Sequence, residues 1–432
     1  MKIFTYPSES GKKRVSEIIK RGLGFSEADY KQVLAYIEDV KERGDKAVVE
    51  YTNRFDSQAV TESNLIVTQE EFENAEKLVD AQFLKALDRA IFQLQSFHQK
   101  QRQNSWIDTP RDGVIVGQLV RAVEAAGIYA PGAKGGKTPL VSSVLMGATP
   151  AKVAGVGSIS LMTPPMADGT INPYMLVAAQ RVGINKVFKA GSAWAIAALA
   201  YGTAKIPKVD VIVGPGNLYV TLAKKIVSGT VGIDMIAGPS EILVIADKYA
   251  NPDHLAADLL SQAEHDTLAS AILVTDSTAL AEATSKAVQS QLAVLPRQEI
   301  AQKSIDDFGS IMVVPDIETA IDLSNKLAPE HLELVVKEPF QYIGQIKNAG
   351  AVFVGPYTPE PVGDYIAGPN HVLPTAGTAR FSSALSVDHF IKKISLINYS
   401  EPAFKKEAQD IITLANIEGL GAHANSIKVR LD

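Results

Sequence analysis

The 432-residue chain contains no cysteine. A sequence without cysteine forms no disulfide, no thiolate metal site and no thiol nucleophile. The composition therefore excludes small disulfide-stabilised domains and every catalytic class that depends on a thiol. It agrees with a reducing compartment, and we expect a cytoplasmic protein.

Long apolar runs and an excess of basic charge are missing as well. No segment reaches the roughly 18 apolar residues that suggest a membrane-spanning helix, and the opening MKIFTYPSES lacks the apolar centre of a secretory signal. The formal net charge is -6, whereas a dedicated nucleic-acid binder normally carries a basic stripe. We expect neither a membrane nor a nucleic acid as a partner.

The sequence pattern changes near Gly113. Before it, residues 17–21, 28–53 and 70–103 are rich in helix-forming residues with apolar positions three and four apart, which predicts helices used for packing and assembly. After it, short apolar segments alternate with helical segments, which predicts a mostly parallel sheet. This part is too long for one sheet, so we expect two α/β units, the second including residues 310–354.

The expected strands are 113–123 as a strand pair, 127–130, 159–162, 187–190, 211–213, 242–246 and 272–275. The expected helices are 142–154, 173–182, 193–202, 218–228, 254–264, 278–292 and 401–414, and a Gly-rich end follows the last of them.

Residues 132–138, GAKGGKT, resemble a phosphate-binding Walker A loop but are one residue short. Such a loop wraps backbone N–H groups around a phosphate over an arc of fixed length. Asp276 could serve as the matching aspartate, but this match is common by chance, so we disfavour nucleotide hydrolysis. Gly214–Asn217 is better placed, because it joins a strand end to a helix start, where α/β sheets bind ligands and helices favour phosphate.

The seven histidines fall into two groups. His98, His254 and His389 occupy contexts that favour surface or capping positions. The other four lie in segments rich in Gly, Pro and polar groups: His265 with Gln262, His331 with Glu330, His371 with Asp364, and His423 with Glu418.

The second group favours a metal site or an acid–base site, although each residue alone is more often structural. Gln262 and His265 are three residues apart, which places both side chains on one face of a helix. An amide oxygen and an imidazole nitrogen can both ligate a borderline cation. Glu330 and His331 follow a helix stop at Pro329, so we expect them to project from a turn or a strand start.

Several longer motifs resemble those of histidinol dehydrogenases, in matching order and approximate spacing from the first helices to the end of the chain. They are Gly238–Glu241, Ser261–Asp266, Ala328–Glu333, Gly355–Thr375 and Glu418–His423. The resemblance implies an enzyme of histidine biosynthesis that oxidises L-histidinol to L-histidine through histidinaldehyde in two NAD-dependent steps.

The resemblance also implies the roles of individual residues and the assembly. It makes Gln262, His265, Asp364 and His423 the ligands of a zinc ion, Glu330 and His331 the acid–base pair, and Tyr129, Trp194 and Asn217 the residues on the NAD side. It makes Ser240, His371 and Glu418 holders of the substrate, together with His331 and the metal ligands. It implies an intertwined homodimer, in which the C-terminal segment with Glu418 and His423 completes the partner's site.

The residue types suit this chemistry. Two nitrogen and two oxygen ligands suit zinc, and the metal would act mainly as a template that fixes the alcohol carbon. His331 is suited to take the hydroxyl proton while hydride leaves to NAD. Because there is no cysteine for a thiohemiacetal, the second oxidation must pass through a hydrate, and Glu330 is the candidate that activates the water.

We therefore predict an α/β fold with two incomplete Rossmann-like parallel-sheet domains and small helical extensions at both ends. The spans are 1–25 for a helical N-terminal arm, 26–128 with 242–385 for a discontinuous first domain, 129–241 for the second domain, and 386–432 for a C-terminal dimerisation and site-completing segment.

Two features depart from the family pattern, both on the expected cofactor side. The loop after Gly132 is longer and adds Lys134 and Lys137, which either meet the pyrophosphate or lie in solvent. Trp194 stands where the family usually has a glutamine that contacts NAD, and it either stacks on a cofactor ring or packs beneath the loop.

Three alternatives stay open. One is a paralogue that oxidises another polar alcohol or uses the cofactor differently. The second is a zinc hydrolase built from the same ligands, and the third is a binding protein in which the acid–base pair is idle.

Overall fold

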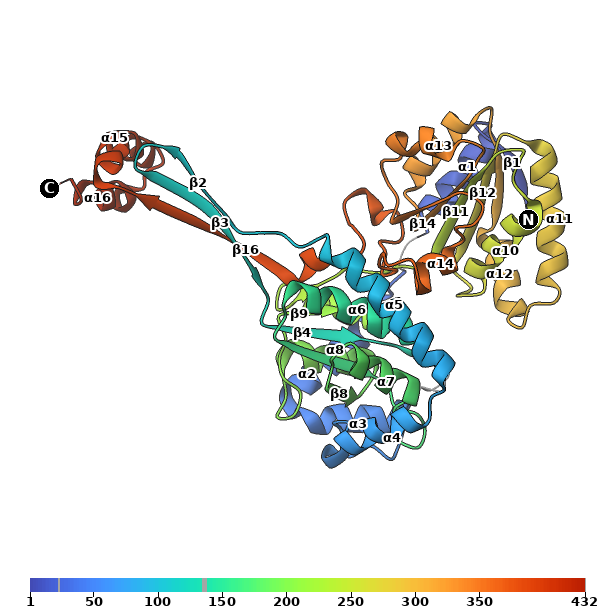
Figure 1. Ribbon diagram of the computed structural model, residues 1–432, viewed down its shortest axis with the longest axis horizontal. Coiled ribbons are helices and arrows are strands. Elements are labelled where there is room, and N and C mark those ends of the chain that lie inside the picture. The colour runs from blue at the N-terminus through green and yellow to red at the C-terminus, as the bar shows by residue number, and fades with distance from the viewer. Residues whose placement is uncertain (22–23, 134–137, 432) are drawn as a thin grey trace. The chain divides into compact units, whose positions relative to one another are not determined.

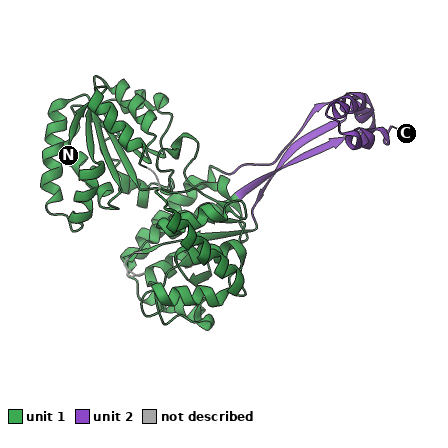
Figure 2. Ribbon diagram, turned by 180° about the vertical axis from the view of Figure 1, so that it is seen from behind, with its two compact units in different colours: residues 1–101, 124–390 green, residues 102–123, 391–432 purple. Residues whose placement is uncertain are grey.

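The structure is a computed structural model that describes residues 1–21, 24–133 and 138–431. The chain forms two compact units, coloured separately in Figure 2. Unit 1 comprises Met1–Gln101 and Glu124–Phe390, and unit 2 comprises Arg102–Val123 and Ile391–Asp432. Lys134 and Lys137 of the longer loop lie outside the described residues.

Unit 1 contains a six-stranded parallel sheet in the order β1-β13-β12-β11-β14-β15 (Figure 1). Its strands are β1 (Ile3–Thr5), β11 (Glu241–Ala246), β12 (Ser270–Thr275), β13 (Ser310–Val313), β14 (His331–Val335) and β15 (Ala351–Val354). The central strands are continuous apolar runs because both faces are covered.

Helices cover the two faces of this sheet, as alternate residues of β11 illustrate. Ile242 and Val244 pack with α10 (Pro252–Ala263), α11 (Thr278–Leu292) and α12 (Gln298–Phe308). Leu243 and Ile245 pack with α1 (Glu9–Ile19) and α13 (Ile317–Leu327).

Unit 1 also contains a five-stranded parallel sheet in the order β10-β9-β4-β7-β8. Its strands are β4 (Ala125–Tyr129), β7 (Ser158–Thr163), β8 (Lys186–Lys189), β9 (Val211–Val213) and β10 (Gly232–Ile233). The helices that connect these strands are α6 (Val141–Ala154), α7 (Pro173–Arg181), α8 (Ser192–Tyr201) and α9 (Leu218–Val227).

The N-terminal helices pack on this second sheet's helices. They are α2 (Glu27–Arg43), α3 (Asp45–Phe55), α4 (Gln69–Lys77) and α5 (Ala81–Gln99). The helices α2 and α3 lie on α8, α4 lies on α7, and α5 lies on α6. This extra layer explains why α8 is apolar on all sides, with residues 193–200 all buried.

Unit 2 is an antiparallel sheet followed by two helices. The sheet contains β2 (Trp106–Arg111), β3 (Val114–Ala122) and β16 (Ile391–Tyr399), with β3 in the middle. The helices are α15 (Glu401–Ile417) and α16 (Gly421–Lys428). An ion pair of 2.7 Å between Arg111 Nε and Glu407 Oε1 joins the sheet to α15.

The remaining elements are short. They are β5 (Gly132–Ala133), β6 (Thr138–Pro139), α14 (Glu360–Tyr365) and the 3-10 turns η1 (Glu62–Asn64), η2 (Pro339–Gln341), η3 (Ile343–Gln345), η4 (Thr378–Arg380) and η5 (Val387–Phe390).

The predicted α/β class with parallel sheets is confirmed, and most predicted elements lie within a few residues of the observed ones. Several elements differ. Residues 113–123 form the single strand β3 instead of a strand pair, because its partners β2 and β16 come from other segments. The elements β1, β2, β16 and α12 were not predicted, and α16 replaces the expected Gly-rich end.

The structure groups the elements differently from the predicted domain spans. The prediction places residues 1–25 in a separate arm, whereas β1 pairs with β13 and α1 packs on the same sheet. The prediction joins residues 26–128 to 242–385 in one domain, whereas α2 to α5 and β4 belong with the five-stranded sheet. It begins the last segment at 386, whereas unit 2 also includes 102–123, because β3 pairs with β16.

No helix in the described part of the chain is both long enough and apolar enough to cross a membrane.

Gly214 ends β9 in a turn that only glycine accommodates. Its φ is 120°, and a Cβ there would collide with the carbonyl oxygen of Tyr129. Gly214→Ala should therefore lower the free energy of unfolding by about 3 kcal/mol or more. Gly155 has a φ of 92° but open space around its Cβ position, so Gly155→Ala should cost only about 1 kcal/mol. Urea unfolding of both variants checks this, and equal losses would contradict it.

Candidate active site

Residues from both parallel sheets line a cavity of about 350 Å³ in unit 1. Segments that follow β4 and β9 contribute Pro131 and Pro215 from the five-stranded sheet. The six-stranded sheet contributes residues near the starts of β11, β12 and β14 and from the segment that begins at α14. They include Ser240, His265, Glu330, His331, Glu360, Asp364 and His371.

Glu330 and His331 stand at the start of β14. The helix α13 ends at Leu327, and Ala328 takes a left-handed φ of 53° that turns the chain toward the strand. Both side chains are buried, with Glu330 7% and His331 4% exposed. The expectation that this pair projects from a strand start is confirmed.

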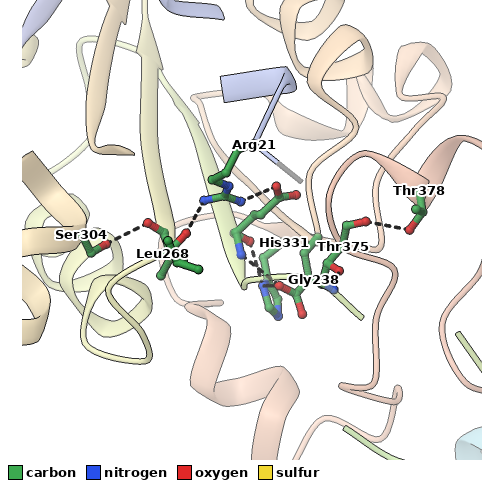
Figure 3. A network of polar contacts seen from close by, with 10 residues as sticks. Arg21, Gly238, Leu268, Ser304, His331, Thr375 and Thr378 are labelled. Atoms are coloured by element: carbon green, nitrogen blue, oxygen red, sulfur yellow. Dashed lines mark hydrogen bonds and ion pairs between the residues drawn. The ribbon is translucent and has the colours of Figure 1, made fainter. Parts of the chain in front are cut away.

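The backbone of Glu241, the first residue of β11, binds both side chains (Figure 3). Its N–H donates to Glu330 Oε2 at 2.9 Å, and its carbonyl oxygen accepts from His331 Nδ1 at 3.0 Å. Because a carbonyl oxygen only accepts, Nδ1 carries the imidazole proton and Nε2 keeps the lone pair. Among the described residues Nε2 has no hydrogen-bond partner, and Glu360 Oε1 lies 3.8 Å away. His331 is therefore arranged to accept a proton at Nε2.

Burial dominates the electrostatics of this pair. It raises the pKa of Glu330 well above its ordinary value, and the nearby carboxyls of Glu360, Glu241 and Asp364 raise that pKa further. Burial lowers the pKa of His331 to about 3, so the imidazole is neutral near pH 7. A neutral imidazole is the form that acts as a base.

Glu360 and Asp364 lie one turn apart on α14 and form a cluster with His331. One ligand-type atom from each of the three lies within 4.8 Å of the others, a group able to hold a metal ion. Burial raises the pKa of Asp364 to about 6 and raises the pKa of Glu360 well above its ordinary value. A bound cation would offset the free energy that burying these carboxylates costs.

Gln262 lies on α10 and is fully buried beside Glu360. With its amide nitrogen turned toward Glu360, it donates to the two carboxylate oxygens at 3.0 and 2.9 Å, and the same nitrogen lies 3.2 Å from His331 Nδ1, whose proton already goes to the Glu241 carbonyl. The amide oxygen is then turned away from Glu360. His265 follows two residues after the end of α10, so it lies beyond the helix on which it was expected. Together with Asp364, these residues offer an oxygen, a nitrogen and a carboxylate, a donor set that fits zinc.

Ser240 and His371 line the same cavity. The His371 Nδ1 atom lies 4.0 Å from Asp364 Oδ1, and burial lowers the pKa of His371 to about 4. The carbonyl oxygen of Ser240 accepts from the N–H of Ser270 at 3.0 Å, which fixes the turn before β11. Both side chains are thus placed to contact a molecule in the cavity.

The three residues expected on the NAD side lie around α8 and α9. A second cavity of about 300 Å³ is lined by Asn217, Trp194, Gln32, Tyr36, Phe55, Asp56, Ser192 and Tyr219. The Asn217 side chain caps α9 by accepting from the Val220 N–H at 3.1 Å. The Tyr129 hydroxyl accepts from the Ser192 N–H, also at 3.1 Å, at the start of α8.

Trp194 is mainly a core residue, 3% exposed, although it also lines this second cavity. Its Nε1–H donates to Thr52 Oγ1 at 3.2 Å, and its ring stacks on Phe55 with centroids 5.3 Å apart. Trp194 thus packs against α3, while the expected packing beneath the longer loop falls on residues outside the described ones, and a contact with NAD stays a prediction.

Glu418 and His423 belong to unit 2, whereas the cavity residues belong to unit 1. Glu418 ends α15, His423 lies in α16, and both are exposed within their unit. Their predicted roles therefore stay predictions.

The three histidines expected to be idle differ from one another. His98 is buried, not at the surface, and its Nδ1 pairs with Gln101 Oε1 at 2.7 Å. His254 is exposed. His389 Nδ1 accepts from the Ser386 N–H at 3.2 Å, which agrees with a capping position.

Comparison with known proteins gives one consistent family. The model of the histidinol dehydrogenase family matches residues 22–431. The chain is 56% identical to histidinol dehydrogenase of Desulfotalea psychrophila over 91% of this chain and 90% of that protein, and 52% identical to that of Bacillus subtilis over 98% and 97%. The chain belongs to the histidinol dehydrogenase family.

The fold agrees with this family over the whole chain. The crystal structure of histidinol dehydrogenase from Elizabethkingia anophelis superposes with a TM-score of 0.93 at 40% identity, and it covers 100% of this chain and 98% of that one. The resemblance inferred from the sequence motifs is confirmed, and the chain is an oxidoreductase of the histidinol dehydrogenase family.

The structure gathers six of the predicted site residues around one cavity, and Gln262 lies buried beside one of its lining residues, Glu360. The six are Ser240, His265, Glu330, His331, Asp364 and His371. Sequence reasoning missed Glu360, which is 2% exposed and contacts both His331 and Gln262. A signal for it existed, because Glu360 precedes Asp364 by four residues, the spacing of one helical face.

Glu333 is another buried carboxyl that sequence reasoning missed. Its Oε1 accepts from the backbone N–H of Glu360 at 2.9 Å, and its Oε2 has no partner among the described residues. Burial and the neighbouring Asp258 raise the pKa of Glu333 to about 9. Glu333 thus holds the start of α14 while keeping its own proton.

Glu333→Gln should make folding stability less sensitive to pH. The folded protein keeps this proton up to about pH 9, whereas the unfolded chain releases it near the ordinary pKa of 4.5. The folded state therefore binds more protons between these values, and stability falls as pH rises, by up to about 1.4 kcal/mol per pH unit. Urea unfolding at several pH values measures the slope. Glu338→Gln, at an exposed position, is the control, and parallel profiles for wild type and Glu333→Gln would rule the effect out.

Proposed function

We propose that this chain oxidises L-histidinol to L-histidine through histidinaldehyde, in two NAD-dependent steps, as a zinc-requiring enzyme of histidine biosynthesis in the cytoplasm. The observation that carries the proposal is the arrangement of His331, which lines the cavity, bonds the Glu241 carbonyl through Nδ1 and leaves Nε2 without a hydrogen-bond partner among the described residues. Membership of the histidinol dehydrogenase family supports the choice of substrate.

In the first step, His331 Nε2 takes the proton of the substrate hydroxyl as hydride leaves the same carbon for the nicotinamide of NAD. The products are the aldehyde, NADH and a proton that rests on the imidazole. Ser240 and His371 line the cavity in positions to hold the polar groups of the substrate.

In the second step, Glu330 draws a proton from water as its oxygen adds to the aldehyde carbon, and the proton resting on His331 passes to the former carbonyl oxygen, which gives a hydrate. His331, having released its first proton, takes a hydroxyl proton of the hydrate as the second hydride leaves, and the carboxylic acid forms. The Glu330 side chain must be ionised to act this way, so a cation nearby favours this step by lowering its pKa.

The proposed zinc ligands are Gln262, His265 and Asp364, with His423 of the partner subunit as the fourth. Zinc held there would supply a template that binds the amine and imidazole of the substrate and fixes the alcohol carbon. The Glu360 carboxylate accepts from the Gln262 amide and so fixes its orientation, as second partners of metal ligands commonly do.

The proposed homodimer is supported by the surface of unit 2. Large apolar side chains are exposed on its sheet and helices: Trp106, Ile107, Ile394, Ile397, Leu414 and Ile417. Large apolar side chains left exposed on a sheet and its helices are typical of contact surfaces between proteins. A partner's C-terminal segment would bring Glu418 and His423 to the cavity.

We expect the purified protein to form two NADH per L-histidinol consumed. Chelation should abolish NADH formation, and added zinc should restore it. Glu330→Gln and His331→Asn should lower kcat by about 100-fold or more with a modest change in KM, because each removes a proton acceptor used in the transition state.

The stoichiometry follows from the final NADH absorbance after complete conversion of a known amount of histidinol. One equivalent of NADH would limit the enzyme to the alcohol step. Turnover of another polar alcohol but not of histidinol would favour the paralogue, and metal-dependent hydrolysis without NAD would favour the zinc hydrolase.

Two inactive variants should restore activity to each other if the site is shared between subunits. His423→Asn and Glu330→Gln are each expected to be inactive, but a mixed dimer holds one site with both residues intact. Random mixing makes half of the dimers mixed, so activity should recover to about one quarter of the wild-type value. Unmixed variants refolded separately are the control, and no recovery in verified mixed dimers would place His423 in its own chain's site.

A further inference from the structure

The side chain of Glu241 is held by Arg21, which follows α1 (Figure 3). Arg21 Nη2 lies 2.5 Å from Glu241 Oε1, and Nη1 donates to the carbonyl oxygen of Leu268 at 2.8 Å. The two side chains are 4% and 12% exposed. This is a buried ion pair that lies outside the cavity and touches no proposed substrate or metal ligand directly.

The backbone of Glu241 is paired with a neighbouring strand on only one of its two sides. In the sheet, Glu241 pairs with Ser270 of β12, but its pairing with β14 begins only at the next residue, Ile242 with His331. On the β14 side, the backbone groups of Glu241 instead bind the side chains of Glu330 and His331. The position of Glu241 therefore sets where both side chains of the acid–base pair are held.

Arg21 is attached to a firm part of the fold. Val15 and Ile18 of α1 are buried in the core on one face of the six-stranded sheet. From there the guanidinium reaches two strand starts at once, Glu241 of β11 and Leu268 just before β12. A planar guanidinium can bind two oxygens in fixed directions, which a single ammonium cannot.

We infer that Arg21 is a positioning residue for the acid–base pair, acting through Glu241 on Glu330 and His331. The inference rests on the proposed function of that pair. Arg21 precedes residue 22, where the match to the family model begins, so its role comes from the contacts and not from a motif.

Arg21→Met tests the inference in the full-length enzyme. We expect kcat to fall by about 10-fold to 100-fold, because a small displacement of a catalytic group costs this much, while KM for L-histidinol changes less than about threefold. Arg14→Met is the matched control. Arg14 lies on α1, the helix just before Arg21 in the chain, and binds Ser310 Oγ at 2.7 Å and the Asp307 carbonyl at 2.8 Å, so its loss should leave kcat unchanged.

The double variant Arg21→Met, Glu241→Met separates positioning from folding. Replacing a buried ion pair by apolar side chains is often neutral for stability, so its melting temperature should return toward wild type. Its kcat should stay low, because the tie to Glu241 is still missing. Recovery of kcat together with stability would overturn the inference, as would wild-type kcat in Arg21→Met.

Measuring Glu330→Gln in the same assay distinguishes failure of the positioning role of Arg21 from failure of the proposed function. If Glu330→Gln loses turnover while Arg21→Met keeps it, only the positioning role fails. If Glu330→Gln itself keeps full turnover, the proposed function of the acid–base pair fails.

Discussion

The burial of carboxyl groups around one cavity is the constraint on which the site depends. Glu330, Glu333 and Glu360 have pKa values raised far above the ordinary range, and the pKa of Asp364 is raised to about 6. Two of these carboxyls receive a backbone N–H, Glu330 from Glu241 and Glu333 from Glu360. These bonds offset only part of the desolvation, and a cation bound in the cavity would offset more of it and release protons.

The cavity lies where two kinds of sheet edge contribute to one site. Segments at the carboxyl ends of β4 and β9 supply backbone near helix starts, the usual place for ligands in α/β folds. The six-stranded sheet contributes its amino edge instead. At that edge, the first residue of a parallel strand keeps backbone groups without ladder partners, and Glu241 uses them to hold an acid and an imidazole. These bonds hold Glu330 and His331 at the start of a strand, where they are more rigidly positioned than in a loop.

Much of this arrangement could be predicted from the sequence, and the remainder depends on contacts between distant segments. Parallel strands buried on both faces appear as apolar runs, so most strands and helices of unit 1 were predictable. The motifs around Glu330 and Asp364 contain many of the residues that line the cavity. No local pattern reveals that Arg21 meets Glu241, 220 residues away, or that β3 pairs with β16. The grouping of the N-terminal helices could not be predicted for the same reason, because these helices cover a sheet formed later in the chain.

Trp194 restricts how the cofactor side can recognise NAD. Its single polar group, the indole N–H, already donates to Thr52, and Phe55 stacks on its ring. An indole in this state offers no hydrogen bond to a ligand, unlike the glutamine usual at this position, so any contact with a cofactor must be apolar or stacking. Polar recognition then falls to groups such as Asn217 and the backbone at the starts of α8 and α9, which favour phosphate. In the proposed site, cofactor binding would therefore rest on backbone and aromatic surface more than on side-chain amides, while the proposed acid–base pair and its bonds to Glu241 would be untouched.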